Sequence, residues 1–184
     1  RKEKNAMSEI VKTMKLHIHV NETGAKSLEE LPAIGDYDVT KGRSYQYYKG
    51  DVLYPFGYGL SYTSFKYSGL KVTEDDEYAN VSFTLKNAGK RAGDEVAQVY
   101  VKLPQRNEVM PVKELKGFER VTLKKGESRN VTIKLRKDQL RYWDEAKGCF
   151  IYPSGEYTIM VGASSADIRL QGVAILSNNH TAAK

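Results

Sequence analysis

Three pairs of neighbouring carboxylates are the first candidates for acid–base chemistry. The pairs are Asp36 with Asp38, Asp75 with Asp76, and Asp144 with Glu145. Two carboxyl groups work as an acid and its partner only when they flank a substrate in a closed pocket that raises the pKa of one of them. All three pairs lie in polar, turn-like stretches. We therefore expect surface or turn residues, and no catalytic residue among them.

Histidine and cysteine offer metal binding and nucleophilic chemistry. His17 and His19 would share one face of a strand and could present two imidazoles to a metal ion. A third ligand at workable spacing is absent, because His180 lies near the far terminus. We expect no metal site and no cofactor. Cys149 has no histidine nearby in sequence, so we expect a buried or half-buried thiol rather than a nucleophile, and a lone cysteine excludes an internal disulfide.

Modification is a further chemical possibility. Four Asn-x-Ser/Thr triplets occur, at Asn21, Asn80, Asn130 and Asn179. In a secreted eukaryotic protein such triplets can carry glycans. Asn130 is expected on an exposed strand face, where a glycan would fit.

The elements that position these residues belong to a globular protein. The 184 residues are 40% hydrophobic and 28% charged, enough for one core of about 100–150 residues. No apolar run approaches the roughly 20 residues of a membrane span, so we expect no membrane partner. The chain begins at Arg1, so residue 1 is not expected to be the natural start, and a targeting signal could lie upstream.

The net charge of +6 is concentrated in one stretch. Residues 102–141 hold 12 basic and 5 acidic side chains. Such a stretch can attract phosphate or an acidic polymer. Its lysines, however, alternate with apolar residues in strand-like spacing, which favours a solvated strand face, and we expect no nucleic-acid partner.

From about residue 65 the sequence predicts short strands. Apolar residues alternate with polar ones around 81–85, 97–103, 131–135 and 157–161, which is typical of strands with one buried face. Turns are expected at 87–89, 124–127 and 152–155, and a bulge at Gly69. A helical turn is expected at 137–140, just before Tyr142 and Trp143, which would plug one end of the core. The pattern predicts an all-β, immunoglobulin-like, antiparallel β-sandwich of the fibronectin type III sort.

The segment before the sandwich differs in composition. Residues 1–44 are too few for a domain, and we expect an irregular N-terminal extension or the tail of a preceding α/β domain. Residues 45–64 form an aromatic linker, 65–176 the sandwich, and 177–184 a C-terminal tail. Nine aromatic residues fall within positions 45–67, and this density predicts packing between domains rather than a sugar-stacking platform. The expected packing residues are Tyr54, Phe56, Tyr58 and Tyr62.

Five blocks of sequence, in order, carry a resemblance to a known family. They are Gly42–Tyr47, Tyr54–Thr63 (Tyr-Pro-Phe-Gly-Tyr-Gly-Leu-Ser-Tyr-Thr), Lys86–Gly93, Val112–Phe118 and Gly155–Tyr157. Together they resemble the C-terminal region of family-three glycoside hydrolases, which include β-glucosidases and β-xylosidases. The resemblance covers about residues 27–176 and implies a fibronectin type III-like domain from about Tyr67 to Leu176, joined by 54–63 to a preceding α/β sandwich domain.

The resemblance also implies a division of labour. In that family the nucleophile and the acid/base carboxylate lie in domains that precede this region, so neither is carried over. The chain is then an accessory domain that stabilises a retaining β-glycosidase and packs on its catalytic domains. The parent would hydrolyse terminal β-linked glucose or xylose, and would be secreted or periplasmic. The alternative is a stand-alone carbohydrate- or polyanion-binding module that uses the basic strands and exposed aromatic residues.

Overall fold

The computed structural model describes residues 38–105 and 109–177, which fall into two compact units. The described part of the first unit comprises residues 38–54 and 109–112. It contains one turn of 3₁₀ helix, η2 (Val39–Lys41), capped by the Asp38 carboxylate, which accepts from the Thr40 amide at 2.9 Å. The two parts of this unit are joined by the Val112 amide, which donates to the Gln46 carbonyl at 2.6 Å.

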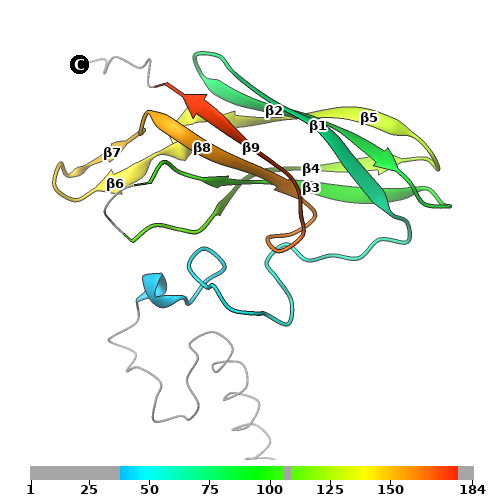
Figure 1. Cartoon of the computed structure of the whole chain (residues 1–184), viewed down its shortest axis with the longest axis horizontal. Coiled ribbons are helices and arrows are strands. Elements are labelled where there is room, and N and C mark those ends of the chain that lie inside the picture. The colour runs from blue at the N-terminus through cyan, green and yellow to red at the C-terminus, as the bar shows by residue number, and fades with distance from the viewer. Residues whose placement is uncertain (1–37, 106–108, 178–184) are drawn as a thin grey trace, which may run out of the picture. The chain divides into compact units, whose positions relative to one another are not determined.

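The second unit, whose described part is 55–105 and 113–177, is built from long antiparallel strands (Figure 1). The strands are β1 (Phe65–Glu74), β2 (Tyr78–Asn87), β3 (Gly93–Lys102), β4 (Glu114–Leu123), β5 (Ser128–Arg136), β8 (Gly155–Gly162) and β9 (Ile168–Leu176). One sheet has the order β1-β2-β5 and the other β4-β3-β8-β9. The predicted all-β antiparallel sandwich is confirmed.

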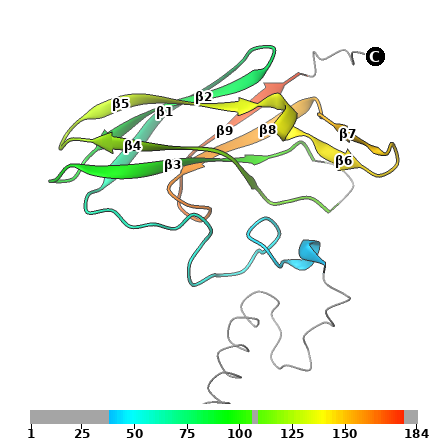
Figure 2. The same ribbon diagram turned by 180° about the vertical axis from the view of Figure 1, so that it is seen from behind.

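The core lies between the two sheets, which Figures 1 and 2 show as two layers. The alternation in β2 explains why these sheets face one another. Val81, Phe83 and Leu85 are buried, whereas Ser82 and Thr84 between them are half-buried on the outer face. Successive side chains of a strand point to opposite faces, so alternate apolar residues seal one side of the sheet.

Two local predictions are confirmed and one is wrong. Gly69 has φ +68° and lies where the β1–β2 register shifts, as expected for a bulge. The turn at 124–127 is closed by the Glu127 amide, which donates to the Lys124 carbonyl at 3.0 Å. No turn forms at 152–155: residues 152–154 are irregular and lead directly into β8, and the Tyr157 hydroxyl donates to the Pro153 carbonyl at 2.6 Å.

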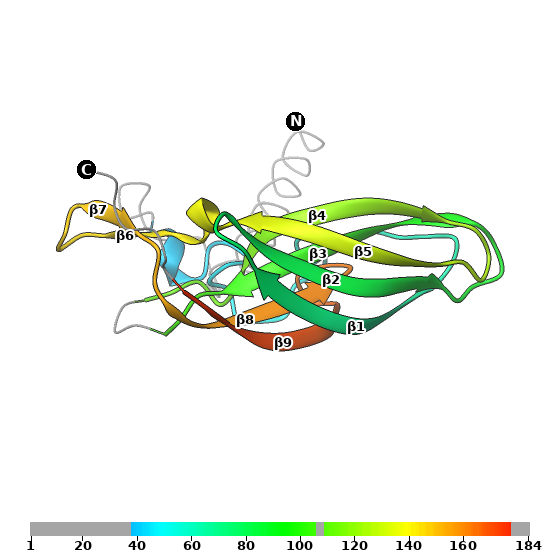
Figure 3. The same ribbon diagram turned by 90° about the horizontal axis from the view of Figure 1, so that it is seen from above.

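The predicted helical turn exists, but its neighbour is placed differently. The 3₁₀ turn η3 (Lys137–Leu140) buries Leu140 fully. Trp143, expected to plug the core, instead lies on a two-stranded ribbon of β6 (Tyr142–Asp144) and β7 (Cys149–Ile151). Figure 3 shows this ribbon extending beyond the end of the two sheets. Leu140 is the buried residue at this point, whereas the Trp143 indole on the ribbon is 51% exposed.

Candidate functional site

The middle of β3 is buried on both faces, which is unusual for a strand of a two-layer sandwich. Ala97, Val99 and Val101 face the core, as the alternation predicts. Gln98 and Tyr100 point the other way and are nevertheless buried. Something must therefore cover the outer face of the four-stranded sheet at this point.

The cover is the segment 55–64, which we call the strap. The Gln98 side-chain amide donates to the Gly57 carbonyl at 2.9 Å and to the Ala163 carbonyl at 2.7 Å. The Tyr100 hydroxyl donates to the Gln98 Oε1 at 2.6 Å. The Phe56 carbonyl accepts from the Ser165 amide at 2.8 Å. All three polar atoms of the buried Gln98–Tyr100 pair are thus satisfied, as burial requires.

The strap is fixed at its far end as well. The Ser61 hydroxyl donates to the Asp94 carbonyl at 3.2 Å, and the Thr63 hydroxyl donates to the Asn87 Oδ1 at 2.7 Å. The Ala88 amide closes this end by donating to the Ser64 carbonyl at 2.8 Å. The strap is therefore a built part of the second unit and not a free linker.

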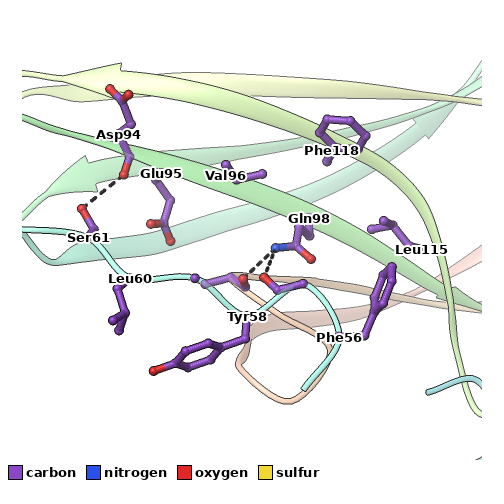
Figure 4. Close-up of a pocket in the computed structure, with 13 residues that line it drawn as sticks. Phe56, Tyr58, Leu60, Ser61, Asp94, Glu95, Val96, Gln98, Leu115 and Phe118 are labelled. Carbon is purple, nitrogen blue, oxygen red and sulfur yellow. Dashed lines mark hydrogen bonds between the residues drawn. The ribbon is translucent and has the colours of Figure 1, made fainter. Parts of the chain in front are cut away.

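A groove of about 410 Å³ opens between the strap and the outer face of β3 and β4 (Figure 4). Its apolar lining comes from Phe56, Tyr58, Leu60, Val96, Leu115 and Phe118. Phe118 is 67% exposed, and Phe56, Tyr58, Leu60 and Val96 are exposed too. A contiguous apolar surface of this kind marks a site for a ligand or a protein partner.

Two carboxylates, Asp94 and Glu95, line one end of the groove. Burial raises the pKa of the Glu95 carboxyl, although a 2.7 Å hydrogen bond from the Tyr67 hydroxyl opposes the rise. The Arg169 guanidinium packs 5.6 Å from the Tyr67 ring centroid and pairs with Asp167 at 2.6 Å. Asp94 pairs with Arg120 on the open side. The groove is apolar along its length and acidic at this end.

The four predicted packing residues are placed differently from one another. Phe56 and Tyr58 come together at the groove. Tyr62 follows on the strap and is 93% exposed. Tyr54 belongs to the first unit and is 70% exposed.

The β3 and β4 side of the groove was not predicted from the sequence. Gln98, Tyr100, Leu115 and Phe118 were not among the expected packing residues, although Leu115 and Phe118 lie in one of the five family blocks. A signal was present for Phe118, because Val121 and Leu123 define the core face of β4 and Phe118 has the opposite parity. No comparable signal marks Gln98, whose burial depends on the strap.

The chemical candidates take structural positions where they are described. The Asp75 carboxylate accepts from the side chain of Asn80 and from the amides of Tyr78 and Glu77, which lowers its pKa, the opposite of what a catalytic acid needs. The Asp144 carboxylate accepts from the Lys147 amide at 3.0 Å within the β6–β7 turn.

Several of the candidate acid–base, metal-binding and glycosylation residues lie outside the part of the chain that the structure describes. Asp36, His17, His19, His180, Asn21 and Asn179 lie outside the described residues. Within 38–105 and 109–177 no three histidine, cysteine or acidic side chains gather closely enough to hold a metal ion. The same residues include no helix long and apolar enough to cross a membrane. The expectation of a buried Cys149 is wrong, because β7 belongs to the protruding ribbon and the thiol is exposed.

The predicted solvated face of lysines holds at Lys124, Lys125 and Lys134, which are exposed, and is wrong at Lys113, Lys116 and Lys137, which are half-buried. Lys134 and Asn130 do lie on the outer face of β5. Several other basic side chains of the stretch are neutralised by carboxylates. The pairs are Lys116 with Glu114, Arg120 with Asp94, Arg129 with Glu127, Arg136 with Asp138, and Lys137 with Glu74. This pairing weakens the alternative of a polyanion-binding surface.

Comparison with known proteins identifies the sandwich. Residues 95–165 match the family model of the fibronectin type III-like domain. The chain contains a fibronectin type III-like domain. It is 45% identical over 134 residues to thermostable β-glucosidase B of Acetivibrio thermocellus, covering 69% of this chain and 18% of that protein. It is 38% identical over 152 residues to a xylan 1,4-β-xylosidase of Xylanibacter ruminicola, covering 82% and 17%.

Solved structures of similar proteins superpose on the fibronectin type III-like domain. A GH3 β-glucosidase of Bifidobacterium adolescentis superposes with a TM-score of 0.67 at 39% identity, covering 72% of this chain and 20% of that one. The resemblance to the C-terminal region of family-three glycoside hydrolases is confirmed. The chain spans about a fifth of the length of the relatives it matches.

Proposed function

We propose that this chain is the accessory C-terminal region of a retaining β-glycosidase that acts on terminal β-linked glucose or xylose. The catalytic carboxylates would lie in the preceding domains of the same polypeptide. The observation that carries the proposal is the groove between the strap and β4, whose walls are fixed by buried hydrogen bonds while its apolar rim stays exposed.

The exposed rim is suited to an interface within one polypeptide. Each aromatic ring offers about 150–250 Å² of surface, so Phe56, Tyr58, Tyr62 and Phe118 supply most of one side of an interdomain contact of about 600–1,500 Å². At about 25 cal/mol per Å², covering this surface stabilises the assembled enzyme considerably. The strap precedes β1 directly in the sequence, so its rings belong to the segment that would connect the sandwich to a preceding domain.

The acidic end of the groove would orient the partner domain along the groove. Glu95 is half-buried beside apolar walls, and an arriving cation would stabilise its charged form. We expect the catalytic domain to place apolar side chains along the groove and a basic side chain next to Glu95. Electrostatic complementarity of this kind fixes register more than it adds affinity.

The test compares the same variants in two settings. In the isolated chain Phe118→Ala should change the free energy of unfolding by less than about 0.5 kcal/mol, because the ring is exposed. In the full-length enzyme Phe118→Ala and Tyr58→Ala should lower the Tm while turnover of aryl β-glucosides and β-xylosides stays near normal. Equal effects in both settings would contradict the proposal, as would a normal Tm with sharply weakened substrate affinity.

A further inference from the structure

The β6–β7 ribbon carries a second exposed aromatic cluster, separate from the groove. Trp143 and Phe150 are paired across the two strands. Their ring centroids are 5.2 Å apart with planes at 73°, an edge-to-face arrangement. Trp143 is 51% exposed and Phe150 61% exposed. The neighbouring stacked pairs, Tyr67 with Phe83 and Tyr152 with Tyr157, each contain a fully or nearly fully buried ring instead.

Arg141 completes this cluster from the residue before β6. Its guanidinium lies 5.7 Å from the Phe150 ring centroid, and its Nε donates to the Asp138 carbonyl at 2.7 Å. The guanidinium is therefore held in place by its Nε hydrogen bond next to the Phe150 ring. Within residues 38–105 and 109–177 its two terminal nitrogens make no hydrogen bond, so they can donate to a ligand.

The exposed area of the cluster decides whether a protein or a sugar is the better occupant. Half to three-fifths of two rings amounts to roughly 200 Å² of exposed apolar surface. A stable protein interface buries about 800 Å² on each side, which a ribbon with three residues in each strand cannot supply. One or two sugar rings match this area.

The chemistry of the cluster suits a sugar. A pyranose ring has an apolar face of polarised C–H groups, which packs against the electron-rich face of an aromatic ring. Its edge carries hydroxyl groups, which accept from guanidinium N–H groups and donate to solvent. Trp143 and Phe150 supply the apolar surface, and Arg141 supplies fixed donors next to it.

We propose that Arg141, Trp143 and Phe150 form a platform that binds one or two pyranose units of a neutral β-linked glycan. The choice of β-linked glucose and xylose chains rests on the proposed function. The platform itself follows from the ribbon. It would hold polymeric substrate near the enzyme and would take no part in bond cleavage.

The single tryptophan makes the platform directly observable, because Trp143 is the one tryptophan in the sequence. The 184-residue chain is titrated with cellohexaose and with xylohexaose while the tryptophan emission is recorded. A saturable change in emission with millimolar or tighter affinity is the expected result. Constant emission up to the solubility limit of both sugars would overturn the proposal.

Variants locate the binding, measured by migration in gels containing soluble β-glucan or xylan. Phe150→Leu keeps an apolar side chain and should weaken retardation about tenfold, the loss of one ring contact. Arg141→Gln and Trp143→Ala should weaken it at least as much, and Phe118→Ala, an exposed ring at the groove, should not. Thermal melts establish that each variant is folded.

Two outcomes of the gel experiment would exclude the platform. Retardation that persists in Trp143→Ala would place binding elsewhere. Retardation only by an acidic polymer, lost on adding salt, would show a charge interaction instead. Neither outcome affects the Tm comparison at the groove, so failure of the platform and failure of the interdomain role can be told apart.

Discussion

Gly57 passes over Gln98 so closely that a Cβ atom on Gly57 would lie 2.0 Å from the Gln98 Oε1. Gly57 also has φ +77°, a conformation that residues with a side chain rarely adopt. The close approach lets the Gln98 amide reach the Gly57 carbonyl, and this hydrogen bond holds the strap on the sheet.

Gly57→Ala should therefore loosen the strap. The strained backbone and the lost buried hydrogen bonds together should reduce the free energy of unfolding by about 2–4 kcal/mol, measured by urea denaturation. Gly59→Ala is the matched control, because nothing lies within 4 Å of a Cβ at that position. Similar losses in both variants would mean that the strap contributes nothing specific.

Asn87→Ala should destabilise the other end of the strap. The buried Asn87 amide donates to the carbonyls of Arg91 at 2.7 Å and Leu123 at 3.1 Å. Its Oδ1 accepts from the Thr63 hydroxyl and from the Gly89 amide. Alanine leaves these partners unsatisfied, and we expect a loss of about 2–4 kcal/mol in the free energy of unfolding.

The control for Asn87 is Asn130→Ala. Asn130 is exposed and accepts one hydrogen bond, from the Thr84 hydroxyl at 2.9 Å. Asn130→Ala should change the free energy of unfolding by no more than about 0.5 kcal/mol, as at most surface positions. A cost at Asn87 no larger than this would refute the role assigned to its side chain.

Gly117→Val should overpack the core. A Cβ at Gly117 would lie 2.7 Å from the Ile133 Cγ2 and 2.8 Å from the Leu135 Cδ2, both of which belong to the opposite sheet. Overpacking of this kind costs about 1–3 kcal/mol, so the Tm of the isolated chain should fall clearly. Phe118→Val, one residue further along β4 on the outer face, should leave it nearly unchanged.

Glu95 should give the stability of the chain a distinctive pH dependence. Its pKa is raised in the folded state, so folding is favoured when the carboxyl is protonated and loses stability as the pH rises through the folded pKa. Glu95→Gln removes this loss. The Tm of the variant relative to the parent should therefore increase from about pH 4 toward neutrality.

Glu127→Gln tests the opposite sign. Hydrogen bonds from the Lys124 amide and Arg129 lower the pKa of Glu127, so its stabilising contribution is present near neutral pH and is lost in acid. The Tm of Glu127→Gln should therefore fall below that of the parent as the pH rises. A difference in Tm that does not vary with pH for Glu95→Gln would contradict the burial of that carboxyl.

Much of the fold was determined by the sequence itself. Alternation along β2, β5 and β8 predicted the sandwich because a period of two places every second side chain in one core. Gly69 predicted its bulge, and the turn at Gly126 followed from its residue types. These features depend on neighbours in sequence, so no knowledge of distant contacts was needed.

The site was decided by tertiary structure. Phe56 and Tyr58 were expected to be packing residues because positions 45–67 are dense in aromatic residues. The side chains of Gln98, Tyr100 and Phe118 lie beside them only because β3 and β4 pair side by side. The exposure of Cys149 and Trp143 likewise follows from the pairing of β6 with β7 into a ribbon that extends beyond the two sheets (Figure 3). Burial is a property of what lies on the opposite side of a residue. A local pattern records which face a side chain takes, and cannot record what covers that face.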